Sequence, residues 1–164
     1  MPQPEPPTAG QESAWDYPRP AVLERNQRHI LIRLHGEVLA DTRGGFRVLE
    51  TSHPPTYYLP IGDVKREWLR AVPGRGTFCE WKGFASYFDI VSPAGTLQRA
   101  CWTYPNPTES FAGIVDHLAF YAAPMDSCSV DGELVTPQEG PFYGGWITSH
   151  VAGPFKGPPG TEFW

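Results

Sequence analysis

Prolines and glycines recur along almost the whole chain, and they restrict the folds that it can adopt. The 164 residues include 19 prolines and 17 glycines. Proline lacks the backbone N–H that helix interiors and central strands use, and both residue types favour turns. Long helices are therefore unfavourable, whereas short strands joined by tight turns suit the pattern. We predict a mainly β, mainly antiparallel domain with one or two short helices.

Runs of branched and aromatic residues lie between these turn signals and indicate strands. The clearest hairpin signal is Asp131-Gly132, because both residues readily adopt the positive φ angles of a type I′ turn. His35-Gly36 is a second two-residue turn. Short helices are expected over residues 63–70 and 108–115, since Asp and Thr can cap a helix N-terminus. The expected strands are residues 29–34, 37–40, 46–50, 56–59, 84–91, 97–104, 118–122, 127–130 and 133–135.

The two ends of the chain differ from its middle. Residues 1–13 have little to bury and are predicted to be a disordered tail, whereas residues 14–164 are predicted to form one domain. Residues 15–20 place two aromatics between prolines, either to cover apolar surface or to form a wall of a ligand site. Residues 140–164 combine glycines and prolines with many aromatics. Because exposed aromatics are unfavourable in water, we expect an ordered arm that packs on the domain.

Composition narrows the classes of partner. Hydrophobic residues make up 40% of the chain and charged residues 19%, as in globular domains. The net charge is −5 without a basic cluster, which argues against nucleic-acid binding. The sequence shows no membrane-length apolar run and no signal-peptide pattern, so we expect no membrane association and a cytoplasmic location. Three widely spaced cysteines favour neither a disulfide framework nor a zinc site, and no cofactor is indicated. The oligomeric state is left open.

The stretch from Thr77 to Tyr87 contains the most reactive pair of side chains. Cys79 and Lys82 are three residues apart, and Gly83 follows, which indicates a loop entering a strand. If both side chains face one cleft, the ammonium lowers the thiol pKa and makes Cys79 a nucleophile. Alternatively, Cys79 is a small buried apolar residue. Lys82 is then an ion-paired surface residue or a ligand for an anion.

Acidic and imidazole groups in the same half of the chain could complete such a site. Glu50 closes an expected strand and could pair with Lys82, and His53 follows it closely. A histidine has the right pKa range for acid–base work, although His53 could equally be a loop residue. His117 is a second candidate base, or a core histidine with satisfied hydrogen bonds.

Aromatic residues are frequent, with 6 Trp and 7 Tyr in the chain. They can fill a thin β core, or they can stack on a planar ligand. We predict a ligand-binding cleft between two sheets, lined by Tyr58, Tyr87, Trp102 and Tyr104. Glu50, Cys79, Lys82 and Tyr87 are expected to converge on that cleft.

Several segments resemble a known family. These are Trp15-Asp16-Tyr17-Pro18-Arg19-Pro20, Leu49-Glu50-Thr51-Ser52-His53-Pro54-Pro55, the core Cys79-x-x-Lys82-Gly83-x-Ala85-x-Tyr87, Trp102-Thr103-Tyr104-Pro105, His117-x-Ala119-Phe120-Tyr121 and Gly144-Gly145-Trp146-Ile147-Thr148. The chain is similar over nearly its whole length to the bacterial and fungal "domain of unknown function 427" family. The resemblance implies a tent-like fold of two antiparallel sheets and implies no established reaction.

A nucleotidyltransferase label is sometimes attached to that family, but the sequence gives it little support. Such enzymes hold magnesium with paired carboxylates, and no Asp-x-Asp or Asp-x-Glu pair lies on an expected strand. The Gly153-Pro154-Phe155-Lys156-Gly157 segment lacks the Gly-Lys-Ser/Thr of a phosphate-binding loop. Three hypotheses follow, in this order: a domain that binds a small polar or anionic molecule, an enzyme with Cys79 as nucleophile and His53 or His117 as base, and a protein-interaction module.

Overall fold

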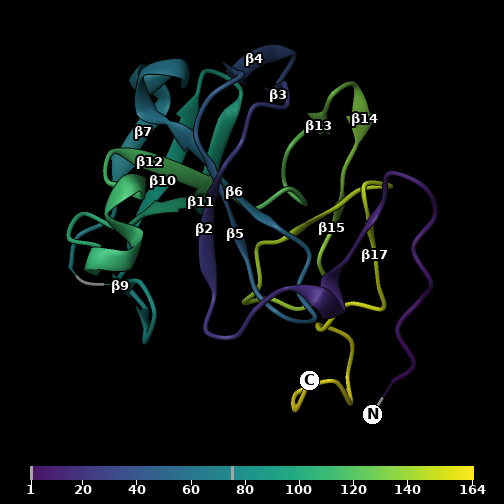
Figure 1. Ribbon diagram of the computed structural model, residues 1–164. Coiled ribbons are helices and arrows are strands. Elements are labelled where there is room, and N and C mark those ends of the chain that lie inside the picture. The colour runs from purple at the N-terminus through teal and green to yellow at the C-terminus, as the bar shows by residue number, and fades with distance from the viewer. Residues whose placement is uncertain (1, 75) are drawn as a thin grey trace.

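Two antiparallel sheets form the body of the protein (Figure 1). The computed structural model describes residues 2–74 and 76–164. The larger sheet has seven strands, ordered β2-β5-β6-β12-β11-β10-β7. Their bounds are β2 Val22–Arg25, β5 Phe46–Leu49, β6 Thr56–Pro60, β12 His117–Phe120, β11 Gly95–Thr103, β10 Ser86–Ser92 and β7 Leu69–Ala71. The predicted mainly β, antiparallel fold is confirmed.

The smaller sheet has four strands, ordered β14-β13-β3-β4. Both of its hairpins use the turns predicted from sequence: His35 and Gly36 have φ of 51° and 78°, and Asp131 and Gly132 have φ of 49° and 82°. Positive φ at both central residues defines a type I′ geometry, which matches the twist of the flanking strands. The bounds are β14 Glu133–Leu134, β13 Ser127–Val130, β3 Ile30–Leu34 and β4 Glu37–Thr42.

Alternation along the strands builds one core on each face of the seven-stranded sheet. In β6, Tyr57 and Leu59 enter the main core together with the β3 side chains Ile30, Ile32 and Leu34. The residue between them in β6, Tyr58, belongs to a second core on the opposite face of the sheet. This division follows from the two-residue period of a strand. The second core also contains Val48, Trp102, Phe111, Ile114 and Ala119.

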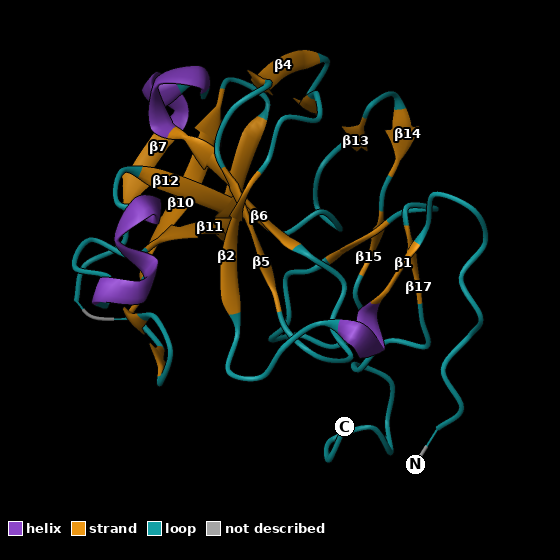
Figure 2. Cartoon of the chain, in the orientation of Figure 1, coloured by secondary structure: helices purple, strands orange, loops and turns teal. Residues whose placement is uncertain are grey.

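Helical structure in the described residues is limited to short 3-10 segments: η1 Ala14–Asp16, η2 Ile61–Asp63, η3 Arg66–Trp68 and η4 Glu109–Ile114 (Figure 2). The expected helix over residues 108–115 is therefore a 3-10 segment with a kink at Phe111. The expected helix over residues 63–70 is wrong in its second half, because Leu69 and Arg70 begin strand β7 and pair with Ile90 and Asp89. No helix in the described part of the chain is long and apolar enough to cross a membrane.

Three pairs of short strands hold the ends of the chain and a central hairpin. The parallel pair β1 Glu12–Ser13 and β17 Val151–Ala152 joins the two arms (Figure 2). The end of the predicted disordered tail is thus in a strand, and the tail also donates hydrogen bonds from Glu5 N to Gly153 O and from Gln11 Nε2 to Ser149 O, both at 2.9 Å. The other pairs are β15 Thr136–Pro137 with β16 Trp146–Ile147, and β8 Phe78–Cys79 with β9 Gly83–Phe84.

Both arms are fixed to the seven-stranded sheet. The buried Arg47 guanidinium of β5 donates to the Glu12 carboxylate at 2.8 and 2.9 Å and to Glu24 at 2.8 Å. The C-terminal arm inserts Trp146 into the main core, and the Trp146 indole donates to Phe120 O at 3.0 Å. In the N-terminal arm, Trp15 packs on Trp164, with 5.5 Å between ring centroids.

Candidate functional site

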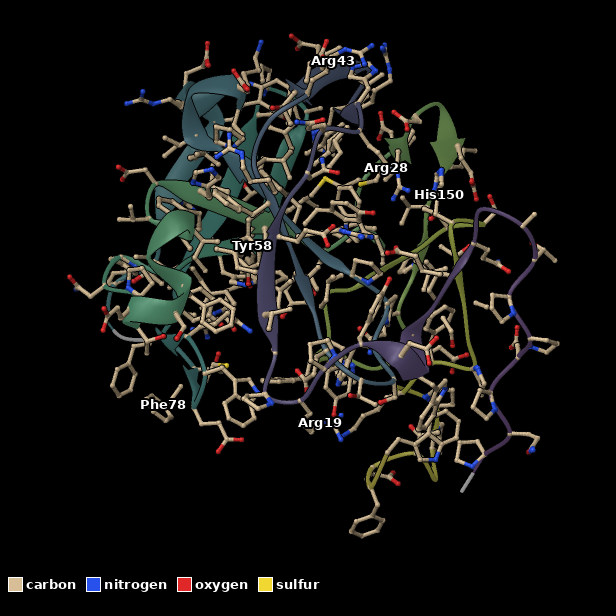
Figure 3. All side chains as sticks on the ribbon, viewed as in Figure 1. Arg19, Arg28, Arg43, Tyr58, Phe78 and His150 are labelled. Atoms are coloured by element: carbon tan, nitrogen blue, oxygen red, sulfur yellow. The ribbon has the colours of Figure 1, made fainter. Side chains whose placement is uncertain are left out.

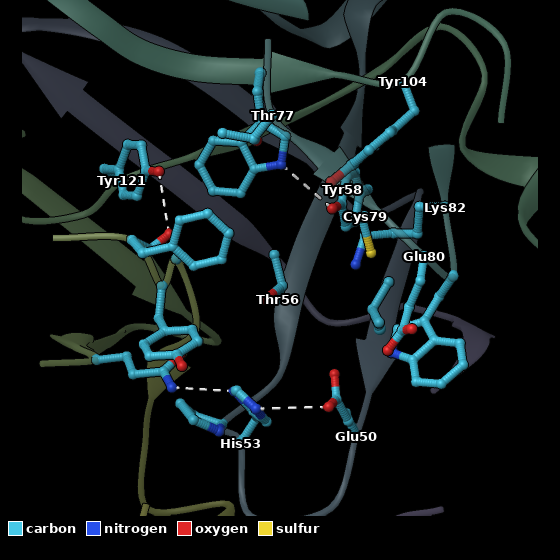
Figure 4. A pocket seen from close by; sticks show the side chains of 18 of the residues that line it. Glu50, His53, Thr56, Tyr58, Thr77, Cys79, Glu80, Lys82, Tyr104 and Tyr121 are labelled. Atoms are coloured by element: carbon cyan, nitrogen blue, oxygen red, sulfur yellow. Dashed lines mark hydrogen bonds and ion pairs between the residues drawn. The ribbon is translucent and has the colours of Figure 1, made fainter. Parts of the chain in front are cut away.

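A cavity of about 500 Å³ lies over the face of the seven-stranded sheet that carries the second core (Figure 4). The sheet forms its floor, the β8–β9 hairpin forms one wall and the C-terminal arm forms another. The expectation of a cleft between the two sheets is wrong in this respect. The space between the sheets is filled by the main core, whose side chains include Ile32, Tyr57 and Leu118.

Eight of the nine candidate site residues line this cavity: Glu50, His53, Tyr58, Cys79, Lys82, Tyr87, Trp102 and Tyr104. They come from the segment after β5, from β6, from the β8–β9 hairpin, from β10, and from β11 and the residue that follows it. Figure 4 shows Cys79 and Lys82 near Tyr58 and Tyr104, whereas Glu50 lies beside His53. These residues therefore share one cavity, while the roles assigned to them stay predictions.

Aromatic residues of the floor are held by the sheet register and by one another. Tyr87 of β10 is paired with Trp102 of β11, which places neighbouring rings on the same face. The Trp102 indole donates to the Tyr58 hydroxyl at 3.4 Å, and its ring packs on Tyr121 with 4.6 Å between centroids. Burial raises the pKa of both Tyr58 and Tyr104. Both hydroxyls are therefore protonated at neutral pH and can donate hydrogen bonds.

The wall that carries Lys82 is a tight hairpin. Gly83 has a φ of +107°, a conformation that L side chains rarely adopt, and its position lets Cys79 pair with it across the hairpin. The Lys82 backbone donates to Cys79 O at 3.2 Å and accepts from Thr108 N at 3.1 Å. These bonds fix the root of the Lys82 side chain. The outer face of the hairpin carries Phe78, which is exposed at the edge of the molecule (Figure 3).

The Lys82 ammonium lies over aromatic rings. Nζ is 5.6 Å from the Tyr104 ring centroid and 5.9 Å from that of Phe111. No carboxylate of residues 2–74 and 76–164 forms an ion pair with it. The expected pair between Glu50 and Lys82 is not formed, because the arm before β2 brings Arg19 to 3.5 Å from the Glu50 carboxylate. Lys82 therefore keeps its hydrogen-bond donors for solvent or a ligand.

His53 is held in one orientation by the C-terminal arm. Gln138 donates through Nε2 to Lys156 O at 2.7 Å, and its Oε1 accepts from Gly145 N at 3.1 Å. These two contacts fix which end of the amide is the donor, so Nε2 also donates to His53 Nδ1 at 3.1 Å. The His53 proton then sits on Nε2, which lies 3.6 Å from the Glu50 carboxylate (Figure 4).

The protonation of His53 follows from the same surroundings. Burial and the nearby cations Lys156, Arg19 and Lys82 lower the pKa of His53 from 6.5 to about 4. The imidazole is therefore neutral at pH 7. Its Nδ1 lone pair already accepts the Gln138 hydrogen bond, so it is not free to take a proton from a neighbouring thiol.

The thiols differ in exposure. Cys79 is half-buried and faces the cavity, whereas Cys101 and Cys128 are buried in the main core. Burial raises the pKa of Cys101 and that of Cys128, the latter to about 12.

The second candidate base, His117, does not line the cavity. Its Nδ1 contacts Val115 O at 2.8 Å and its ring packs edge-on against Phe46.

Sequence reasoning missed Gln138 and the residues that the C-terminal arm contributes. Gln138 follows β15, and Phe142, Tyr143 and Lys156 belong to the arm; all four line the cavity, and Tyr121, after β12, completes the wall next to Phe142. The Tyr121 hydroxyl donates to Phe142 O at 3.2 Å. The glycine at position 144 is the local sequence feature that fits this placement of the arm. An added Cβ there would overlap the Trp102 ring, so the arm lies directly against the floor of the cavity. Gln138 has no sequence signal that marks it.

A comparison with protein-family models found a match. A family model described as "Domain of unknown function (DUF427)" matches residues 22–131, which is more than half of the chain. The chain belongs to this family. No curated protein matches the sequence. The part shared with the DUF427 family includes the floor of the cavity and the β8–β9 hairpin, while the wall from Gln138 to Lys156 lies beyond it.

In the residues that the structure describes, no group of three or more His, Cys, Asp or Glu side chains could hold a metal ion. The cavity is lined by aromatic rings, by two lysines, Lys82 and Lys156, and by two glutamates, Glu50 and Glu80.

Proposed function

We propose that the protein binds a small polar or anionic molecule with a planar body in the cavity over the seven-stranded sheet. The observation that carries the proposal is the Lys82 ammonium, which lies in an aromatic wall without a carboxylate partner among the described residues. A cation beside apolar surface is costly unless water or a counter-charge satisfies it. An anionic ligand group supplies that counter-charge.

The size and lining of the cavity suit a small organic molecule. Ligand pockets are typically 300–1,000 Å³, mostly apolar, with a few polar groups that fix the orientation. A volume of about 500 Å³ falls in that range. The half-buried Tyr121 and Tyr143 rings offer surfaces for stacking, and the Tyr58 hydroxyl, which accepts from Trp102, has its own proton to donate.

The test compares two lysine variants of the full chain. Affinities for benzoate and phenyl phosphate are measured by calorimetry for the wild type, Lys82→Met and Lys65→Met. Lys65 is the matched control, because it also lies over an aromatic ring, 5.0 Å from the Trp68 centroid, yet does not line the cavity. We expect Lys82→Met to weaken binding about tenfold or more, as for a lost charge-assisted hydrogen bond, and Lys65→Met to leave it unchanged.

Two results contradict the proposal. Either neither anion binds the wild type, or both bind Lys82→Met as tightly as the wild type. Thermal unfolding of each variant shows whether a loss of binding reflects a loss of fold.

The two alternatives have less support. Cys79 is the one thiol among the described residues that faces the cavity, but His53 has no free lone pair and His117 lies outside. An interaction surface would use the exposed rings of Phe78 and Phe142, yet nothing in the structure shows a partner that covers them. Small-molecule binding therefore explains more of the geometry than either.

A further inference from the structure

Among the described residues, the two ends of the cavity leave different hydrogen-bonding groups without a protein partner. Lys82 and the Tyr58 hydroxyl are donors at one end, where the exposed Glu80 also lines the cavity (Figure 4). Glu50 is an acceptor at the other end, where the Lys156 ammonium lies over the Tyr143 ring. We infer that the ligand is a planar amphoteric molecule, an aromatic or heteroaromatic acid that also carries an amino group. This inference rests on the proposed binding function and narrows it to a class of ligand.

Glu50 supplies the free hydrogen-bond acceptor at the end of the cavity opposite Lys82. Its carboxylate lies 3.5 Å from the Arg19 guanidinium and 3.6 Å from His53 Nε2, and both contacts involve the same oxygen, Oε2. Arg19 makes its short hydrogen bond, 2.8 Å, to Thr51 O instead. Within the described residues, Glu50 Oε1 accepts no hydrogen bond. Figure 4 shows that this oxygen points into the cavity, away from His53.

The neighbours of Glu50 offer a ligand no acceptor. Gln138 and His53 use theirs within the protein, and the Lys156 ammonium can only donate. Gln138 uses its Nε2 for His53 and Lys156 O, and its Oε1 for Gly145 N. The Nδ1 of His53 accepts from Gln138, so the neutral ring offers a ligand no acceptor. The unsatisfied acceptor at this end is therefore the Glu50 carboxylate, and it selects a ligand N–H or O–H donor.

The free oxygen of Glu50 favours an amphoteric ligand over a simple anion. Arg19 and Lys156 offset part of the Glu50 charge, but Oε1 has no hydrogen-bond donor among the described residues and repels an anionic group that comes close to it. A donor group on the ligand turns that contact from unfavourable to favourable. The Tyr143 ring, whose centroid lies 5.2 Å from that of the His53 ring, offers a planar ligand a stacking surface at the Glu50 end.

The experiment uses matched ligands and matched variants. Calorimetric affinities are measured for benzoate, aniline, the aminobenzoate isomers and the aminomethylbenzoate isomers. The proteins are wild type, Glu50→Gln, Lys82→Met and Glu37→Gln. Glu50→Gln keeps the shape of the side chain and removes its charge. Glu37→Gln is the control, because Glu37 pairs with Lys65 at 3.1 Å and does not line the cavity.

We expect at least one of the amino-substituted benzoates to bind the wild type about tenfold more tightly than benzoate, the gain of one charge-assisted hydrogen bond. Glu50→Gln should remove that advantage and leave benzoate binding equal or tighter, because the repulsion is gone. Lys82→Met should weaken benzoate and its amino derivatives alike. Glu37→Gln should behave as the wild type.

The outcomes separate this inference from the function on which it rests. If benzoate binds as tightly as every amino derivative, or if Glu50→Gln weakens both classes equally, the amphoteric assignment is wrong and anion binding stands. If no compound binds the wild type, both are wrong. Thermal unfolding of each variant confirms that its fold is intact.

Discussion

At the scale of single residues, His53 shows how burial by a distant segment sets the charge of a group. The folded pKa of about 4 lies below the unfolded value of 6.5, so between these pH values only the unfolded chain binds the proton. The free energy of unfolding must therefore decrease as the pH falls from 6.5 to 4, by up to about 3 kcal/mol. Above pH 6.5, the neutral His53 makes its full contribution to the free energy of unfolding.

Denaturant unfolding at a series of pH values measures this effect. We expect a flatter dependence in His53→Gln over the same window, and the wild-type slope in His117→Gln, whose ring lies outside the cavity. Equal slopes for the wild type and His53→Gln would show that the folded-state pKa of His53 is not lowered.

Residue types could be predicted from the sequence better than their partners. Eight of the nine candidate side chains line the cavity, and His117 does not; strand alternation and the hairpin glycine, on which most of these predictions rested, are local features. The partners are not local: His53 and Gln138 are 85 residues apart, and Glu50 contacts Arg19 rather than Lys82. Pairing of this kind depends on how the arms return to the sheet, which no local pattern specifies.

At the scale of elements, the C-terminal arm must approach the sheet closely, and Gly144 makes this possible. An added Cβ at Gly144 would overlap the Trp102 ring, whereas a Cβ added at Gly62 would have no atom within 4 Å, and the φ of Gly62 is not positive. We expect Gly144→Ala to reduce the free energy of unfolding by about 1–3 kcal/mol, and Gly62→Ala to change it little. Thermal unfolding of both variants provides the measurement. Equal stability would mean that the arm can move off Trp102 without cost.

Turns and strands could be predicted from the sequence where the residues of the segment itself determine its conformation. The turns at His35-Gly36 and Asp131-Gly132 follow from residues that tolerate positive φ. Strand β7 was missed because three residues carry little pattern, and its pairing with β10 determines its structure. The same holds for β1, whose two residues become a strand through pairing with β17.

At the scale of the whole molecule, the C-terminal arm is part of the fold. Trp146 is 1% exposed in the main core, and the Trp146 backbone donates to Pro55 O at 2.8 Å. Removing residues 140–164 should lower the free energy of unfolding by at least the roughly 3–5 kcal/mol typical of a lost buried Trp, enough to unfold a marginal domain. Circular dichroism during heating tests this. An unchanged melting temperature in the truncated chain would contradict it.

The pairing of β1 with β17 has a consequence for synthesis on the ribosome. Glu12 emerges well before its strand partner Val151 and the cavity residue Lys156. A nascent chain can therefore form the aromatic floor at Trp102 before the arm exists to cover it. Until translation has passed Lys156, that floor is an exposed apolar surface of the kind that chaperones recognise. A prematurely terminated chain would keep it exposed.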